Sequence, residues 1–175
     1  MKKTTLRIFA LLFVVAMISC MFVGCGKSKM NVSVGVQLGE DYINYRYAEE
    51  ELKGNTEFMI PAEHRNFLND VNVEIAYAEG EQVSALDAFI NACVEYDLDY
   101  TLDSTGKSVT VINDYTGFSG KDEEGTVITF FWSYTINGVE PTSGRAADNY
   151  VKDGDKIVFT LTSASADDFD EDSYQ

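Results

Sequence analysis

The chain of 175 residues is strongly acidic: 13 Lys and Arg stand against 29 Asp and Glu, which gives a formal net charge of −16. Such a surface argues against nucleic-acid binding, because phosphate contacts require Lys and Arg side chains. One histidine and three cysteines occur, and no spacing between them is typical of a zinc site. The composition suits an exported, well-solvated protein.

Residues 1–24 have the pattern of a bacterial lipoprotein signal peptide. A basic start precedes the apolar run Ile8–Met17, which is too short for a membrane-spanning helix. A small residue then precedes Cys25, as in a lipobox, and Cys20 offers a competing register. We expect lipidation at Cys25, with residues 25–30 as a tether, and a location at the extracytoplasmic face of a bacterial cell membrane.

The predicted mature chain is more acidic still, because cleavage removes three basic residues and no acidic ones, leaving 10 − 29 = −19 charges. Apart from the lipidated cysteine it keeps one thiol, Cys93, so the fold must rest on its apolar core rather than on an intramolecular disulfide. Residues 31–162 are long enough for one domain. The acidic segment 163–175 is expected to be disordered.

Alternating apolar and polar residues indicate several β-strands. They are expected at 31–38, 71–77, 98–102, 109–112, 126–136 and 157–162. Residues 40–69 are Tyr-rich and follow no clear period. They exceed an ordinary loop, so we interpret them as an insertion with some structure of its own, including a short helix from Pro61 to Leu68. Residues 115–125 are predicted to form a Gly- and charge-rich loop.

One clear helix is predicted at residues 85–96. Ser84 has the character of an N-cap, and Asp87 three residues later completes a near capping box. An apolar stripe at helical spacing follows, which indicates a helix packed on a sheet. Its members are Leu86, Phe89, Ile90, Cys93 and Val94.

The strand at 126–136 is the most aromatic stretch, and Asn137-Gly138 after it predicts a hairpin turn. Its even positions carry Ile128, Phe130, Trp132, Tyr134 and Ile136. One interpretation is that this face packs under the helix. The other is that part of it reaches an edge and stacks on a flat ligand. A single helix cannot cover both faces, so the odd face with Phe131 and Ser133 is also of interest.

From Glu79 onward the chain resembles the transcobalamin-like C-terminal domain family, a β-grasp-like module. The resemblance rests on four segments in order: Glu79–Ala88, Val111–Asn113 before Gly117, Phe131–Gly138 and Asp148–Ile157. It implies an α+β fold, in which a β-grasp-like mixed sheet carries one main helix on one face. The insertion would lie between the first two strands, which would pair with each other.

The resemblance also implies a function. Many bacterial members are exported lipoproteins, and in the vitamin B12 carriers of animals this domain covers one face of the corrinoid, contacting it around the positions of Trp132, Ser133 and Tyr134. Ser133 here replaces an amide-bearing residue of the carriers. We therefore take as ligand-binding candidates Phe131, Trp132, Ser133, Tyr134, Asn113 and Tyr115. No complete corrinoid clamp is expected from this chain alone.

Two functions follow from these observations. The first is a membrane-anchored surface lipoprotein that binds a small molecule, with cobalamin as the most concrete ligand and no certain cofactor. The second is a protein-interaction or adhesion module that uses a free strand edge or Tyr42–Tyr47. No nucleophile elbow surrounds Ser84, and a lone His64 is most simply a surface residue, so we expect no enzyme and no metal site.

Overall fold

The structure is a computed structural model, and it describes residues 27–122, 124–142 and 145–165. The chain divides into two compact units, and the described residues of the smaller are 27–29 and Ala76–Glu81. Within Ala76–Glu81, the Glu81 N–H donates to the Ala78 carbonyl at 3.0 Å, and Gly80 has a φ of 88°. Residues 78–81 therefore form a turn that precedes helix Ala85–Tyr96 in the chain.

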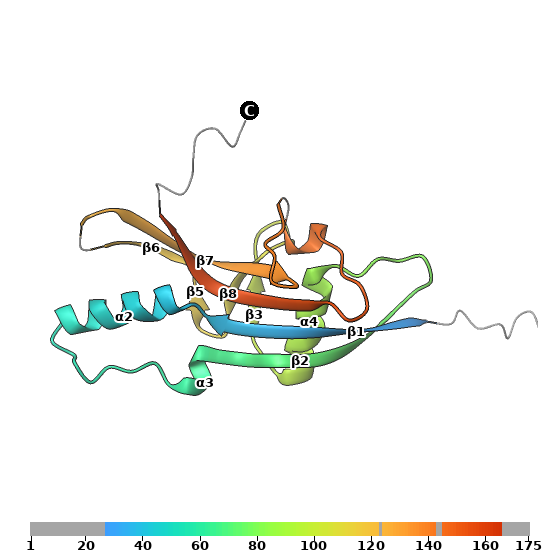
Figure 1. Cartoon of the computed structure of the whole chain (residues 1–175), viewed down its shortest axis with the longest axis horizontal. Coiled ribbons are helices and arrows are strands. Elements are labelled where there is room, and N and C mark those ends of the chain that lie inside the picture. Colours follow the sequence, from blue (N-terminus) through green and yellow to red (C-terminus); the bar gives the residue numbers. More distant parts are fainter. Residues whose placement is uncertain (1–26, 123, 143–144, 166–175) are drawn as a thin grey trace, which may run out of the picture. The chain divides into compact units, whose positions relative to one another are not determined.

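The larger unit, Met30–Ile75 with Gln82–Gln175, contains most of two sheets. The five-stranded sheet has the order β2-β1-β8-β7-β6 (Figure 1). Its strands are β1 Ser28–Leu38, β2 Asn66–Tyr77, β6 Phe118–Lys121, β7 Val127–Ile136 and β8 Lys156–Ser165. Strand β1 is parallel to β8, whereas β7 is antiparallel to both of its neighbours. The second sheet comprises β3 Tyr100–Leu102, β4 Val109–Ile112 and β5 Tyr115–Thr116.

In the part of the chain that the structure describes, two helices of three or more turns accompany the sheets, α2 Glu40–Leu52 and α4 Ala85–Tyr96. Two short elements, α3 Ala62–Arg65 and the 3-10 turn η1 Ala146–Asp148, lie in connections. The predicted α+β class is therefore confirmed, with a mixed main sheet. Among the described residues, no helix combines the length and the hydropathy that crossing a membrane requires.

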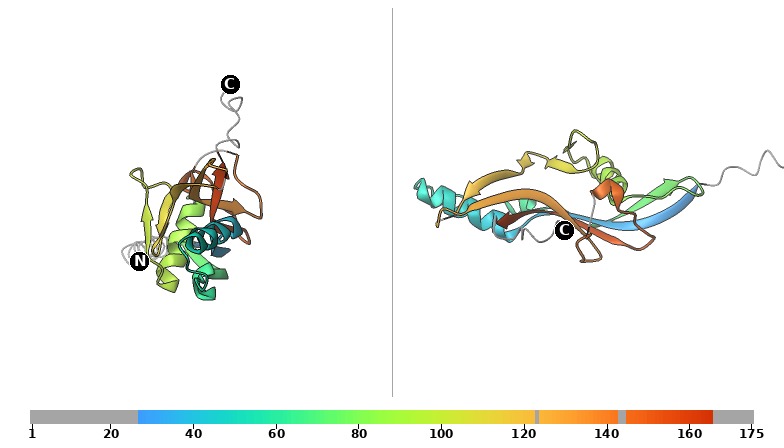
Figure 2. Two further views of the ribbon diagram at one scale, coloured as in Figure 1. Left: turned by 90° about the vertical axis from the view of Figure 1, so that its left-hand side faces the viewer. Right: turned by 90° about the horizontal axis from the view of Figure 1, so that it is seen from above.

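The strand register decides which face of the main sheet is the core. Trp132 lies opposite Leu161 and Tyr134 opposite Phe159, so the even residues of β7 share a face with the odd residues of β8. The two views of Figure 2 show β1, β8 and β7 as neighbours in one twisted sheet. The buried side chains of this face are Val34, Val36, Leu38, Phe130, Ile157, Phe159 and Leu161. The opposite face leaves Phe131 39% exposed and Val127 44% exposed.

Helix α4 forms as predicted and covers this core face. The Asp87 N–H donates to Ser84 Oγ at 3.1 Å, and the Ser84 N–H donates to Asp87 Oδ2 at 2.9 Å, which completes the capping box. Phe89 packs on Phe159 with ring centroids 4.5 Å apart. Val94 was predicted to lie on this apolar stripe, but it is 75% exposed and does not belong to the buried face.

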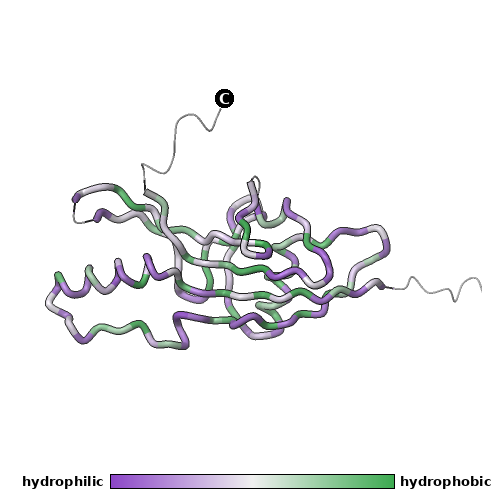
Figure 3. The backbone as a smooth tube through the Cα atoms, in the orientation of Figure 1, coloured by the Kyte–Doolittle hydropathy of each residue, from purple (hydrophilic) through white to green (hydrophobic). Residues whose placement is uncertain are grey.

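Helix α2 was not predicted, and it covers the same face. Tyr42 meets Phe130 edge-on at 5.6 Å, and Tyr45 lies 5.0 Å from the same ring. On the hydropathy scale of Figure 3 the helix is coloured mostly hydrophilic, since tyrosine and charged residues dominate it. The insertion at residues 40–69 therefore contributes a second helix that covers the main sheet. The helix expected from Pro61 to Leu68 is shorter, because β2 already begins at Asn66.

Several predicted boundaries are wrong because strand pairing extends further than the sequence pattern indicates. Strand β1 begins at Ser28, so residues 28–30 are not a tether, and Met30 is buried. Strand β8 continues to Ser165, so residues 163–165 are not disordered. The loop expected at 115–125 contains β5 and β6. The predicted signal peptide 1–24, the predicted lipidation site Cys25 and the predicted disordered residues 166–175 lie outside the described residues.

Cys93 faces the core from α4 and is free. Burial raises the pKa of its thiol to about 12, so the group stays protonated at physiological pH. A protonated, buried thiol is a poor nucleophile and a poor metal ligand. Cys93 therefore acts as a small apolar side chain in the core, as its position on the helical stripe predicted.

Candidate functional site

Strand β7 is longer than its neighbour β6, and this leaves part of one edge uncovered. Strand β6 pairs only with Val127–Phe130. Further along, Ile136 pairs with Val139 across the Asn137-Gly138 turn. Within the described part of the chain, residues 131–135 therefore have a strand partner only on the β8 side.

A hollow of about 220 Å³ lies along this edge, and we call it the β7-edge hollow. Its lining comprises Ser108, Val109, Phe131, Trp132, Ser133, Tyr134, Glu140, Pro141, Ala146 and Phe159. Successive residues of a strand point to opposite faces. Because the hollow lies at an edge, side chains from both faces of β7 can line it. Four of the six predicted ligand-binding residues thus meet at one site.

Trp132 contributes apolar surface rather than a free donor. Its indole Nε1–H donates to the backbone carbonyl of Tyr115 at 3.1 Å, and the side chain is only partly buried. The ring also packs against the aromatic cluster around Phe130. Since its polar atom is already satisfied, the indole offers a ligand a flat, oriented face.

Tyr134 is held in one orientation by two contacts. Its ring stacks on Phe159 at 5.3 Å with an interplanar angle of 22°, and its hydroxyl accepts a hydrogen bond from Asn149 Nδ2 at 2.8 Å. Burial raises the pKa of the Tyr134 hydroxyl, although the Asn149 hydrogen bond opposes this shift. The phenol is therefore neutral at physiological pH and remains able to donate a hydrogen bond.

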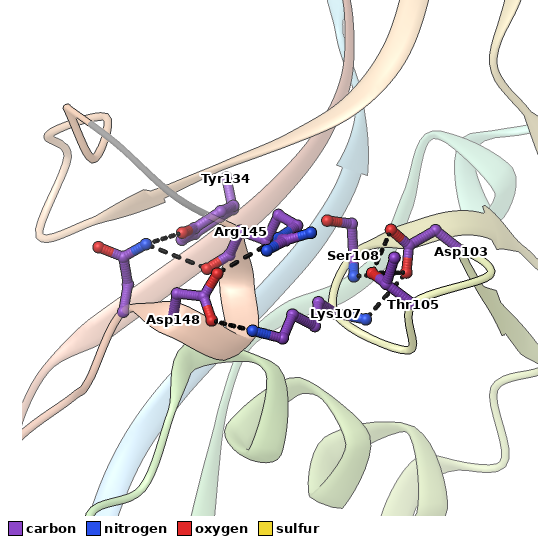
Figure 4. Close-up of polar contacts among 8 residues, drawn as sticks. Asp103, Thr105, Lys107, Ser108, Tyr134, Arg145 and Asp148 are labelled. Atoms are coloured by element: carbon purple, nitrogen blue, oxygen red, sulfur yellow. Dashed lines mark hydrogen bonds and ion pairs between the residues drawn. The ribbon is translucent and has the colours of Figure 1, made fainter.

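A polar network fixes the rim of the hollow next to Tyr134 (Figure 4). Asp148 of η1 accepts from Lys107 Nζ at 2.8 Å and from Arg145 Nε at 3.3 Å. The hydrogen bond from Lys107 lowers the pKa of Asp148. Asp103 in turn accepts the backbone N–H groups of Lys107 at 2.9 Å and Ser108 at 3.3 Å. These contacts hold the loop that carries Ser108 against η1.

The hollow contains few polar groups that could act on a ligand. Beyond Tyr134, they are the hydroxyls of Ser108 and Ser133 and the carboxylate of Glu140, with Ser133 Oγ 3.5 Å from Glu140 Oε1. No His or Cys lines it. Among the described residues, no group of three or more His, Cys, Asp or Glu could hold a metal ion. The arrangement is suited to stacking on a flat ligand and hydrogen bonding to its edge.

The other two predicted ligand residues lie elsewhere. Asn113 and Tyr115 line a separate hollow of about 280 Å³ with His64, Phe67, Asp99 and Asp114. Asn113 has a φ of 48°, and its Oδ1 accepts the Asp99 N–H at 3.2 Å, so it serves a turn. The hydrogen bond from Trp132 to Tyr115 is the connection between the two hollows. His64 is exposed and lies with its ring 6.3 Å from that of Tyr115.

The sequence did not indicate the largest of these three hollows. It measures about 370 Å³ and lies between α2 and the β6–β7 hairpin. Its helical lining residues are Asp41, Asn44, Tyr45, Ala48, Glu49 and Leu52, which follow a spacing of three and four. That spacing is typical of one face of a helix. Because polar and apolar residues are mixed along this face, a hydropathy pattern does not reveal the helix.

The fold and the β7-edge hollow define an α+β domain with a candidate ligand site at a strand edge. Residues 80–163 match the family described as Domain of unknown function (DUF4430). This region contains α4, most of β8 and every residue that lines the β7-edge hollow, whereas α2 precedes it. The narrower resemblance to transcobalamin-like domains remains a prediction.

Other comparisons add little. No curated protein matches the chain. Among solved structures, a protein from Ruminococcus gnavus ATCC 29149, provisionally described as metal binding, aligns over 77% of this chain and 98% of that chain. The identity is 14% and the TM-score 0.37, so we draw no functional conclusion from this similarity.

Proposed function

We propose that this protein is a non-enzymatic ligand-binding domain at the extracytoplasmic face of a bacterial membrane, held there by a lipid on Cys25. One observation supports the ligand site above the others. Phe131, Trp132, Ser133 and Tyr134, chosen from the sequence, line a single hollow with aromatic walls and hydroxyl groups at its rim. Ligand sites in proteins are typically concave and mostly apolar, with a few polar groups that fix orientation.

The corrinoid class is the most concrete ligand, and it comes from the family resemblance. The hollow is smaller than the roughly 300–1,000 Å³ of pockets that enclose drug-sized ligands. It would therefore receive one edge or face of a corrinoid and leave the remainder to solvent or to another protein.

Titration with cobalamin and cobinamide tests this proposal. We expect quenching of Trp132 fluorescence together with a change in the corrinoid spectrum, because Trp132 is the one tryptophan of the chain. Phe131→Ala should weaken binding without unfolding the domain, since Phe131 is 39% exposed. Val127→Ala is the matched control, because Val127 lies on the same face of β7 outside the hollow and is 44% exposed. No spectral change at high micromolar ligand would exclude the corrinoid class.

The anchor has a separate test. Cys25→Ala should release the protein from membranes, because lipidation requires that thiol. Continued membrane retention of this variant, with release by Cys20→Ala, would show that the competing register is used.

The uncovered edge of β7 favours a second candidate function, a protein-interaction module. An extended segment of another surface protein could add a strand beside residues 131–135, and aromatic side chains would then fill the hollow. A photoreactive residue in place of Phe131 should form an adduct with that protein on intact cells, whereas the same residue in place of Val127 should not. Equal adducts at both positions would contradict a specific role of this edge.

A further inference from the structure

The groove between α2 and the β6–β7 hairpin is a second concave site, separate from the β7-edge hollow. Its lining on one side is the helical stripe from Asp41 to Leu52, and on the other side Lys121, Asp122 and Ile128. At 1.5 Å per residue the stripe is about 16 Å long. The volume of the groove, about 370 Å³, lies within the range typical of small-molecule pockets.

The floor of this groove is apolar and rigid. Tyr45 packs against Phe118 and Phe130 with ring centroids 5.7 and 5.0 Å away. Its hydroxyl reaches the backbone of Gly120, where an added Cβ would lie 2.1 Å from the phenolic oxygen. Ile128 of β7 supplies further apolar surface. The aromatic packing keeps the floor in place, so the groove does not depend on a ligand to form.

The groove is open to solvent, because several side chains along its helical side are exposed. Ala48 and Asn44 are exposed, and Leu52 at the end of the stripe is 86% exposed. An apolar chain that lay along α2 would cover the Leu52 side chain. Removing this apolar surface from water would favour binding. The length and the lining therefore suit an elongated apolar group.

The charge around the groove selects the sign of its ligand. Residues 40–53 carry five carboxylates against one Arg and one Lys, and Lys121, Asp122 and Glu124 add two carboxylates and one Lys, a combined net charge of −4. Asp122 uses Oδ1 to accept the N–H groups of Glu124 and Thr126 at 2.9 and 2.8 Å. Among the described residues its Oδ2 has no hydrogen-bond partner. A cation is attracted to this rim and an anion repelled.

We propose that this groove binds an amphiphilic cation, a small molecule with an elongated apolar chain along α2 and one positively charged head at Asp122. The apolar chain would lie over Tyr45, Ala48 and Ile128 and cover Leu52. Glu49 also lines the groove, but it already pairs with Arg46 and with Lys53 Nζ, the latter at 3.1 Å, so Asp122 is the better partner for the head. Asp41 is occupied as well, by Thr162 Oγ1 at 3.1 Å and by the Ser163 N–H.

Titration of the full chain with decyltrimethylammonium, below its micelle concentration, tests the proposal. Binding is followed by calorimetry and by amide chemical shifts, which should change at Ala48, Leu52 and Ile128. Decyl maltoside should bind more weakly, and decyl sulfonate more weakly still. Equal binding of all three amphiphiles, or shifts confined to other residues, would overturn the proposal.

Two variants with matched controls locate the site. Ala48→Phe fills the groove from an exposed helix position and should reduce affinity at least about five-fold, whereas Ala62→Phe, at an exposed position of α3, should not. Asp122→Asn keeps an oxygen for its turn and should weaken cation binding about two- to five-fold with no effect on the maltoside. Glu95→Gln, an exposed carboxylate on α4, is its control.

Unchanged affinity in Ala48→Phe would refute the groove as the site. The same result in Asp122→Asn would refute the position of the head. Neither variant touches a residue of the β7-edge hollow, so failure here leaves the corrinoid test unaffected, and the converse also holds.

Discussion

Helices α2 and α4 cover the same face of the main sheet, yet they do so with different chemistry. Helix α4 buries six side chains, Ala85, Leu86, Ala88, Phe89, Ala92 and Cys93. Helix α2 fully buries only Tyr42 and carries its remaining packing on partly exposed tyrosines. The polar face of α2 is tied together by ion pairs of Arg46 and Lys53 with Glu49 and Glu50.

This difference has an energetic consequence. Burial of apolar side chains dominates helix stability in proteins, whereas exposed ion pairs contribute about 0–1 kcal/mol each. We therefore expect α4 to belong to the most stable part of the fold and α2 to open at lower cost. Substitutions in and around the two helices can test this contrast.

Phe89→Ala should lower the free energy of unfolding by about 3–5 kcal/mol, because Phe89 is fully buried between Phe159 and Tyr100. Denaturant unfolding followed by circular dichroism measures this change. Val94→Ala on the same helix is the control and should change stability by at most about 0.5 kcal/mol, since Val94 is 75% exposed. Similar losses in both variants would show that α4 is not the anchor of the core.

Gly120→Ala should destabilise the fold by about 1–3 kcal/mol, because the added methyl group would overlap the Tyr45 ring. The same substitution should cost less in a Tyr45→Phe background, where the nearest atom is gone. A double-mutant cycle on unfolding free energies measures this coupling. Additive effects would mean that Tyr45 does not pack on β6 as described, and the contrast between the helices would then need revision.

Ser84→Ala should cost about 1 kcal/mol, because it removes the N-cap acceptor of α4. Ser84→Thr should retain most of the stability, since its hydroxyl can still accept the Asp87 N–H. Helix α2 offers no equivalent test. Its N-cap is Gly39, which makes no side-chain cap, and a Cβ there would lie 2.8 Å from the Leu161 carbonyl. Chemical denaturation of the two Ser84 variants measures how much the N-cap of α4 contributes to stability.

Asp41 links the start of α2 to the end of β8, and its contribution should depend on pH. Burial raises the pKa of its carboxyl, but hydrogen bonds from Ser163 and Thr162 outweigh this, so the pKa lies below its ordinary value. A lowered pKa means that the stabilisation is present above the unfolded value of about 3.9 and is lost as pH falls through the folded value.

Asp41→Asn should therefore reduce stability at pH 7 by about 1 kcal/mol and flatten the acid limb of the stability curve. Unfolding measured between pH 7 and acid conditions tests this. Amide exchange should show faster opening of α2 in the variant while α4 is unchanged. An acid limb identical to that of the unchanged protein would show that the Asp41 contacts contribute nothing.

Local chemistry explains what could be predicted. The capping box at Ser84 and Asp87 and the apolar stripe after it act within one turn or two, so α4 was predicted with the observed bounds. The alternation in β7 likewise indicated a strand, and four consecutive residues of one strand must lie close together. Phe131–Tyr134 therefore meet at one edge, which needed no knowledge of distant contacts.

The remaining features depend on contacts between residues far apart in the chain. The alternation of residues in β7 indicated two faces. Only the pairing of Trp132 with Leu161 decides that the face with the even-numbered residues is the one covered by the helices. The tyrosines of α2 gain their apolar environment from Phe118 and Phe130, about 75 residues or more further along the chain, so hydropathy alone could not reveal the helix. Local propensity and capping determined α4, whereas α2, the groove beside it and the uncovered edge of β7 exist only because the tertiary structure places distant aromatic side chains and strands of unequal length together.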